Sequence, residues 1–169
     1  MPENERKYPS NYQHFEVETK WREEWDRMGI YKWDPAGTRE NTYVVDTPPP
    51  TVSGSLHVGH AYSYAQTDVI VRYHRMRGKN IFYPMGWDDN GLPTERRAQN
   101  VFNIRCEAHL PYDPLWKPGT KNSKEIEAIS RQNFIEACEI ITGEDEKAFE
   151  NTWRKLGLSV DWSLIYTTI

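Results

Sequence analysis

The chain lacks the sequence features of several large protein classes. No apolar stretch approaches the roughly 20 residues that a membrane-spanning helix needs. Cys106 and Cys138 stand alone, without the paired spacing of a zinc knuckle, and cytosolic chains rarely keep a disulfide, so we expect ordinary thiols. The opening Met-Pro-Glu-Asn-Glu-Arg-Lys is too polar for a secretory signal. We therefore expect a soluble, cytoplasmic protein with no membrane partner.

An excess of positive charge is also lacking. The 21 Lys and Arg residues are outnumbered by 25 Asp and Glu, which gives a net charge of -4, whereas phosphate-backbone contacts need clustered Lys and Arg. If nucleic acid binds, most of the protein surface that contacts it should lie outside this sequence. The local cluster Arg72, Arg75, Arg77 and Lys79 is interpreted as a solvated helix end. The 7 Trp and 10 Tyr, with 37% hydrophobic residues, argue against disorder.

The chain is organised around residues 43–77, which read as strand, loop and helix. The apolar run 43–45 predicts a short buried strand that three prolines end, because proline supplies no ladder donor. A helix is predicted from His57 to a stop at Gly78. Apolar residues at three- and four-residue steps predict its buried face: Val58, Ala61, Tyr62, Ala65, Val69, Tyr73 and Met76.

Two histidines on the first turn of this helix form a candidate anion site. A helix N-terminus presents unpaired N–H groups and a partial positive charge, which suit phosphate. His57 and His60 lie one turn apart, so both imidazoles can donate to one phosphate, and Gly59 allows a flat ring to approach the backbone. The four residues alone are weak evidence, because helix-start histidines bonded to nearby carbonyls are the commoner arrangement.

A second strand is predicted at residues 80–85, parallel to the first. Strand, helix and strand make a βαβ unit, which predicts an α/β fold with a right-handed crossover. Ligands of such sheets bind beyond the carboxyl ends of the strands, so Pro49, His57 and Asp88 are expected on one rim. Asp88, Asp89 and Asn90 leave two alternatives open, a metal pair or a cap for a helix beginning near Thr94.

The flanking segments predict helices. An amphipathic pattern begins at about Phe15 and ends at Gly29. Two further helices are predicted through residues 134–141 and 149–156, separated by Thr142 and Gly143.

Three ordered blocks resemble one enzyme family. Residues 48–60, Pro-Pro-Pro-Thr-Val-Ser-Gly-Ser-Leu-His-Val-Gly-His, resemble the HIGH-region signature of class I aminoacyl-tRNA synthetases, in the version carried by valyl enzymes. Residues 86–95 resemble the strand-end loop of the branched-aliphatic subgroup, and residues 153–169 resemble a third block. Asp89 departs from the Cys or His that relatives carry there, although Asp-Asp-Asn resembles one branch of valyl enzymes.

The resemblance implies a domain organisation. Residues 43–169 would be the first half of the Rossmann-like nucleotide-binding fold, a parallel βαβ with flanking helices that lead toward an editing insertion. Residues 1–42 would be an N-terminal helical extension and linker. The second half of the fold with its Lys-Met-Ser-Lys-Ser loop, the editing domain and the anticodon-binding region are not in this sequence. An N-terminal fragment, inactive alone, is therefore expected.

The resemblance also implies a reaction. The carboxylate of valine attacks the α-phosphorus of ATP to give valyl-adenylate and pyrophosphate, and the valyl group then passes to tRNA(Val), which binds mainly through the missing domains. Mg²⁺ would accompany ATP as a substrate complex, and no protein-bound metal is expected in this segment. The implied roles are catalytic donation by His57 and His60, ATP binding by His57, Gly59 and His60, and valine binding by Pro49, Thr51 and Asp88, with Asp88 pairing with the α-ammonium.

Three alternatives remain. An isoleucyl enzyme is disfavoured, because such enzymes usually carry an aromatic residue after the prolines, where this chain has Thr51. A non-catalytic module could bind nucleotide or amino acid without chemistry. A small nucleotidyltransferase shares His-x-Gly-His at a helix start, but it would not explain residues 86–95.

Overall fold

The computed structural model describes residues 11–54, 56–119 and 125–169, and it divides into two compact units, one ending at Tyr31 and one from Lys32 to Ile169. In the first unit, helix α1 (His14–Met28) ends at Gly29, whose positive φ of 61° suits a residue without a side chain. The predicted helix is thus confirmed. The first ten residues of the predicted 1–42 extension lie outside the described residues.

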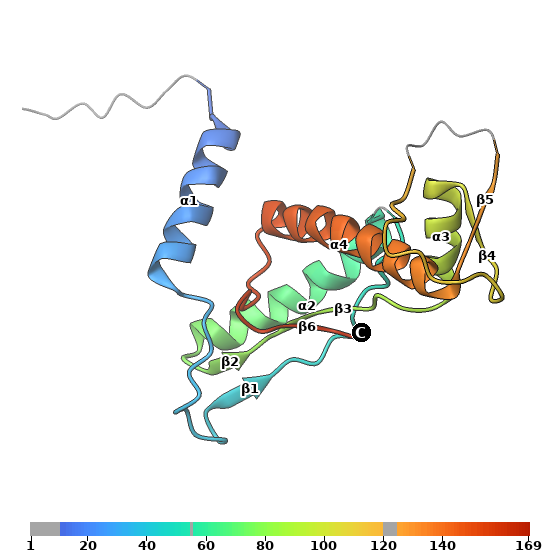
Figure 1. Cartoon of the computed structure of the whole chain (residues 1–169). Coiled ribbons are helices and arrows are strands. Elements are labelled where there is room, and N and C mark those ends of the chain that lie inside the picture. Colours follow the sequence, from blue (N-terminus) through green and yellow to red (C-terminus); the bar gives the residue numbers. More distant parts are fainter. Residues whose placement is uncertain (1–10, 55, 120–124) are drawn as a thin grey trace, which may run out of the picture. The chain divides into compact units, whose positions relative to one another are not determined.

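The second unit contains parallel strands that run side by side (Figure 1). Strand β1 (Thr42–Val44) pairs with β2 (Asn80–Phe82), and β3 (Met85–Trp87) pairs with β6 (Ile165–Thr167). A parallel bridge between Thr51 and Asp88 links the chain segments that follow β1 and β3. The predicted parallel βαβ unit is therefore present. The predicted 80–85 strand is interrupted at Pro84, which has no N–H to donate.

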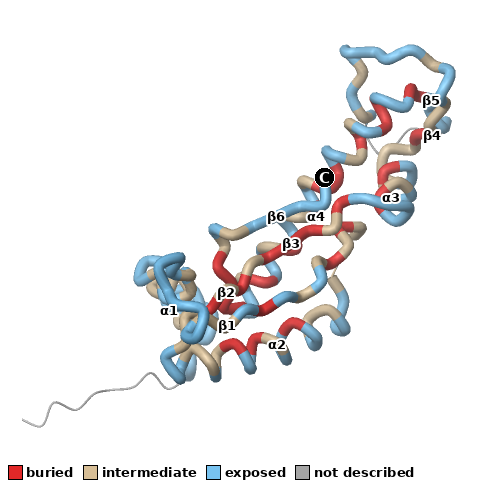
Figure 2. Tube along the Cα trace, turned by 90° about the horizontal axis from the view of Figure 1, so that it is seen from below, coloured by how far each residue is buried: buried red, intermediate tan, exposed pale blue. Residues whose placement is uncertain are grey.

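Helix α2 (Val58–Met76) connects β1 to β2, as predicted, but its buried face is not the predicted one (Figure 2). Its buried residues are Tyr64, Asp68 and Val71. The predicted stripe is largely exposed: Val58 86%, Tyr62 65%, Val69 68%, Tyr73 52% and Met76 81%. Two stripes of the helix carry aromatic and apolar residues, and packing against the strands selects the one that also holds Asp68.

The cluster of basic residues at the end of α2 is partly structural, so its interpretation as a solvated helix end was wrong for two members. Arg72 pairs with Asp68 at 2.7 Å and donates to the carbonyl oxygen of Gly157, and Arg75 donates to the carbonyl oxygen of Ser159 at 3.0 Å. Asp68 also accepts from the Ser159 backbone N–H at 2.8 Å. These contacts tie α2 to the segment that leads into β6.

One continuous helix, α4 (Arg131–Leu156), stands where two helices were predicted. Thr142 lies within it, and its hydroxyl shares its proton between the backbone carbonyls of Cys138 and Glu139. Gly143 costs about 1 kcal/mol relative to alanine in a helix interior. A long buried stripe offsets that cost by packing: Phe134, Ala137, Ile141, Phe149 and Trp153.

The main core joins α2, α4 and the strands, with Tyr64 of α2 and Trp153 of α4 only 4.7 Å apart between ring centroids. A smaller core lies under helix α3 (Leu92–Phe102) and the parallel pair β4 (Ile104–Cys106) and β5 (Glu127–Ile129). Both cysteines are free thiols, and burial raises the pKa of Cys138 to about 11. None of the helices in the described part of the chain is long and apolar enough to cross a membrane.

Candidate active site

The rim beyond the strands holds a cleft of about 680 Å³. One wall is the proline segment that follows β1, and the other is the first turns of α2. Five of the six predicted site residues line it together: Pro49, Thr51, His57, Gly59 and His60. The structure therefore brings together residues that the sequence separates by a loop.

The two histidines form a reciprocal cap at the start of α2. His57 is the N-cap residue, and its Nδ1 accepts from the backbone N–H of Gly59 at 3.1 Å. Nδ1 of His60 accepts from the backbone N–H of His57 at 3.3 Å. Since a neutral imidazole has one acceptor and one donor nitrogen, both rings must carry their proton on Nε2. Burial, followed by the neighbouring His57, lowers the pKa of His60, which favours its neutral form.

Each imidazole therefore has an N–H that the helix cap does not use. The ring centroids lie 3.9 Å apart, so both Nε2–H groups belong to one small region of the cleft. Donation to a single anionic group by the two rings is compatible with this geometry. The backbone N–H groups of His57 and Gly59 already donate to the two Nδ1 atoms. The Nε2–H groups of the rings are therefore the donors toward the cleft.

Gly59 packs closely against the His57 ring within the cap. A Cβ at this position would lie 3.0 Å from both Cε1 and Nδ1 of the His57 ring. The flat ring that approaches this glycine in the structure is thus the imidazole of His57. A side chain here would crowd the ring whose Nδ1 accepts from the same residue.

Tyr64 is a cleft residue that the sequence analysis missed. It lines the cleft, and its hydroxyl donates to the carbonyl oxygen of Pro48 at 2.8 Å, which fixes the proline wall to α2. Burial and the nearby Tyr166 raise its pKa to about 12, so it stays a donor at neutral pH. Its position one helix turn after His60 was a usable signal, because residues four apart share a helix face.

Asp88 lies at the carboxyl end of β3, next to the cleft rather than among its lining residues. The hydroxyl of Thr51 donates to its Oδ2 at 3.0 Å. Backbone hydrogen bonds hold the two segments in register, from Val52 to the Asp88 carbonyl at 2.8 Å and from Asp88 to the Pro50 carbonyl at 3.0 Å. Asp88 is therefore joined to the cleft wall through Thr51.

The cap suggested for residues 88–90 is not formed. The N-cap of α3 is Gly91, and no side chain caps that helix. Asn90 instead bonds to Thr168. Within the described residues, no three His, Cys, Asp or Glu side chains are grouped so that they could hold a metal ion.

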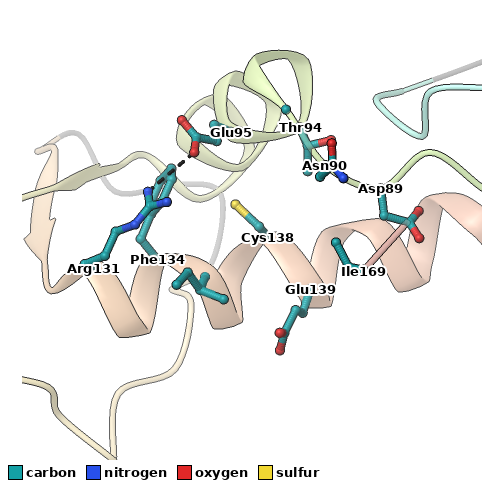
Figure 3. Close-up of a pocket in the computed structure, with 11 residues that line it drawn as sticks. Asp89, Asn90, Thr94, Glu95, Arg131, Phe134, Cys138, Glu139 and Ile169 are labelled. Atoms are coloured by element: carbon teal, nitrogen blue, oxygen red, sulfur yellow. Dashed lines mark hydrogen bonds and ion pairs between the residues drawn. The ribbon is translucent and has the colours of Figure 1, made fainter. Parts of the chain in front are cut away.

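Asp89 lies in a second, smaller pocket between α3 and α4 (Figure 3). It is 3% exposed, and neither carboxylate oxygen receives a hydrogen bond from a donor among the described residues. The side chain of Glu146 lies within hydrogen-bonding reach. Burial, first among the causes, raises the pKa of both carboxyl groups, and two such groups can bond only through a retained proton.

Comparison with known proteins decides the family. The family model of class I tRNA synthetases (I, L, M and V) matches residues 20–169. The chain belongs to the class I tRNA synthetases. Within this family it is 57% identical over 154 residues to the valine–tRNA ligase of Thermobifida fusca and 60% identical over 161 residues to that of Bifidobacterium longum.

The fold agrees with this membership. A LeuRS of Agrobacterium radiobacter, solved in a ternary complex with tRNA and LeuAMS, matches with a TM-score of 0.69 and 25% identity, over 94% of this chain and 16% of that one. The α/β fold predicted from the sequence and the resemblance to valyl enzymes are confirmed. The match to the valine–tRNA ligases includes 90% of this chain but only 18% of the length of each ligase.

Proposed function

We propose that this chain is the N-terminal catalytic part of a valine–tRNA ligase, which activates valine with ATP to valyl-adenylate and transfers the valyl group to tRNA(Val). The single observation that carries the proposal is the pairing of the two motif segments, in which the histidine cleft and Asp88 are joined through Thr51 at 3.0 Å. The similarity of this chain to valine–tRNA ligases supports the choice of valine over isoleucine as the proposed amino acid.

In this proposal His57 and His60 donate from Nε2 to the phosphate oxygens of ATP. Charge develops on those oxygens as the valine carboxylate attacks the α-phosphorus, so donors already aimed at them stabilise the transition state more than the ground state. Support comes from the two Nδ1 atoms, which are held by backbone N–H groups. Gly59 contributes by leaving room for the His57 ring.

The amino-acid end of the site is assigned to Pro49, Thr51 and Asp88. The carboxylate of Asp88 would pair with the α-ammonium of valine, and Pro49 with Thr51 would form part of the side-chain pocket wall. Mg²⁺ would enter with ATP and neutralise phosphate charge, and no side chain of this chain is assigned to it. The tRNA would bind mainly through parts of the protein outside this chain.

The assignment of Asp88 is tested by Asp88→Asn in a full-length enzyme that carries this segment, using valine-dependent ATP–pyrophosphate exchange. The KM for valine should rise by about tenfold or more, since an unpaired ammonium in a closed site is costly, while the KM for ATP stays nearly unchanged. Glu139→Gln, the same change at an exposed carboxylate of α4, should leave both values unaltered. An unchanged valine KM would remove Asp88 from the site, and a wild-type preference for isoleucine would overturn the valine assignment.

A further inference from the structure

Asp88 lies between two threonine hydroxyls that come from the segments on its two sides. Thr51, after β1, donates to Oδ2 at 3.0 Å, and Thr168, directly after β6, lies 3.2 Å from Oδ1. Strand pairing sets the place of Thr168, because Thr167 is the register partner of Trp87 and the Thr168 N–H donates to the Trp87 carbonyl at 3.2 Å. The two contacts thus reach different oxygens of one carboxylate.

The direction of the Thr168 hydrogen bond follows from a count of donors. A threonine hydroxyl has one proton and two lone pairs. The Thr168 oxygen accepts from the backbone N–H of Asp89 at 3.1 Å and from the side-chain amide nitrogen of Asn90 at 3.1 Å. That nitrogen also donates to the Thr168 carbonyl at 3.4 Å, which sets the orientation of the amide. With both lone pairs engaged, the remaining proton of Thr168 points at Asp88.

We propose that Thr168 is a positioning residue for the amino-acid site, which holds the Asp88 carboxylate from the side opposite Thr51. Two hydroxyl donors on different oxygens oppose rotation of the carboxylate about the Cβ–Cγ bond. A carboxylate has about four lone-pair positions, so two remain for the ammonium group of an amino acid. The inference rests on the proposed function, because it needs Asp88 to bind that ammonium.

Thr168 contributes little to folding by burial. It is exposed, and neither hydrophobic core includes it. The neighbouring Thr167 is also exposed, but its hydroxyl donates to a backbone oxygen of Ile169 at 2.6 Å instead. The chain therefore offers a matched pair of threonines, one bonded to Asp88 and one not.

The test compares Thr168→Val, Thr168→Ser and Thr167→Val in a full-length enzyme that carries this segment, by ATP–pyrophosphate exchange. Thr168→Val keeps the side-chain shape but removes the hydroxyl, so the valine KM should rise by about five- to tenfold, with the ATP KM unchanged. Thr168→Ser should restore the valine KM to within about twofold, since it keeps the donor. Thr167→Val should behave as wild type.

Two further measurements separate positioning from a general structural effect. Inhibition by 3-methylbutanoate, which has the side chain and carboxylate of valine but no ammonium, should be equal in wild type and Thr168→Val. In an Asp88→Asn background, Thr168→Val should add less than about twofold, because it acts through Asp88.

The outcomes distinguish the two claims. If Asp88→Asn raises the valine KM but Thr168→Val does not, or if the two changes add in full, the positioning role is overturned and the proposed function stands. If Asp88→Asn leaves the valine KM unchanged, the proposed function itself has failed at this residue, whatever Thr168 does.

Discussion

At the scale of single residues, the sequence places two histidines at a helix start, and the cap decides what they can do there. Each Nδ1 is an acceptor for a backbone N–H, so each ring presents a donor on Nε2. Alanines at both positions would leave the cleft without these donors. So would side chains with a capping acceptor but no second nitrogen. Hydrogen bonds within residues 57–60 thus determine which nitrogen of each histidine can donate into the cleft.

Replacing His57 or His60 by alanine should lower kcat for valine activation more than it raises the KM for either substrate. The reason is that the donors are proposed to strengthen as charge develops on phosphate, and one such donor contributes about 2 to 4 kcal/mol. Exchange kinetics of the full-length enzyme measure this, with His109→Ala, at an exposed loop position, as control. A rise in KM with kcat untouched would mean that the histidines serve ground-state binding.

Asp89 gives a second prediction at this scale, on stability against pH. Burial raises the pKa of Asp89 and of Glu146, so the folded chain retains protons that the unfolded chain releases. The free energy of unfolding should therefore fall as pH rises from the ordinary carboxyl range through the raised pKa values. Asp89→Asn should flatten this slope and raise stability at neutral pH, because an amide carries no charge and can donate to Glu146.

Thermal unfolding of the chain at about pH 5 and about pH 7.5 measures the effect. Glu139→Gln is the control, since Glu139 lines the same pocket but is exposed. Equal pH dependence in wild type and Asp89→Asn would show that Asp89 already has a cationic or donor partner in solution.

At the scale of elements, the pairing of β3 with β6 brings the last strand to the site. Gly86 and Tyr166 are register partners in this pair. A Cβ at Gly86 would overlap the outer end of the Tyr166 ring, so this ring lies where a side chain at Gly86 would otherwise stand. The motif Gly-Trp-Asp therefore begins with a residue that leaves room for the Tyr166 ring from the neighbouring strand.

Gly86→Ala should destabilise the chain by about 1 kcal/mol, because the added methyl group must push aside the ring of Tyr166, which is exposed and can rotate away. Gly143→Ala is the matched control, since a Cβ there meets nothing within 4 Å inside α4. That change should stabilise the helix by up to about 1 kcal/mol. Chemical denaturation of the two variants distinguishes them, and equal stability would contradict the packing assigned to Gly86.

At the scale of the whole molecule, the chain carries the cleft but covers 18% of the length of the valine–tRNA ligases it matches. We predict that the purified 169-residue chain folds at least in part but shows little or no valine-dependent exchange. In the proposed function the histidines donate to one side of the triphosphate, and donors for the pyrophosphate side would have to come from elsewhere. Exchange comparable with a full-length synthetase, and lost on His57→Ala, would show that the short chain is itself an enzyme.

The sequence alone determined the local elements and the order of the motifs. Proline restricts the backbone, glycine permits positive φ, and apolar residues at helical spacing mark a helix, and each of these acts within a few residues. The end of α1 at Gly29, the start of α2 at His57 and the parallel βαβ unit were predictable for that reason. So was the grouping of Pro49 with the histidines on one rim.

The tertiary structure alone decided which surfaces are buried and which distant groups meet. The apolar stripe of α2 that begins at Val58 fits the helical period as well as the stripe that is buried. Only contact with the strands selects the face that carries Tyr64 and Asp68. In the sequence Gly143 predicts a break between two helices. In the structure, packing along α4 outweighs the low helix propensity of this glycine. Thr168 and Asp88 stand far apart in the sequence, and strand register, which no local preference encodes, brings a hydroxyl to the carboxylate.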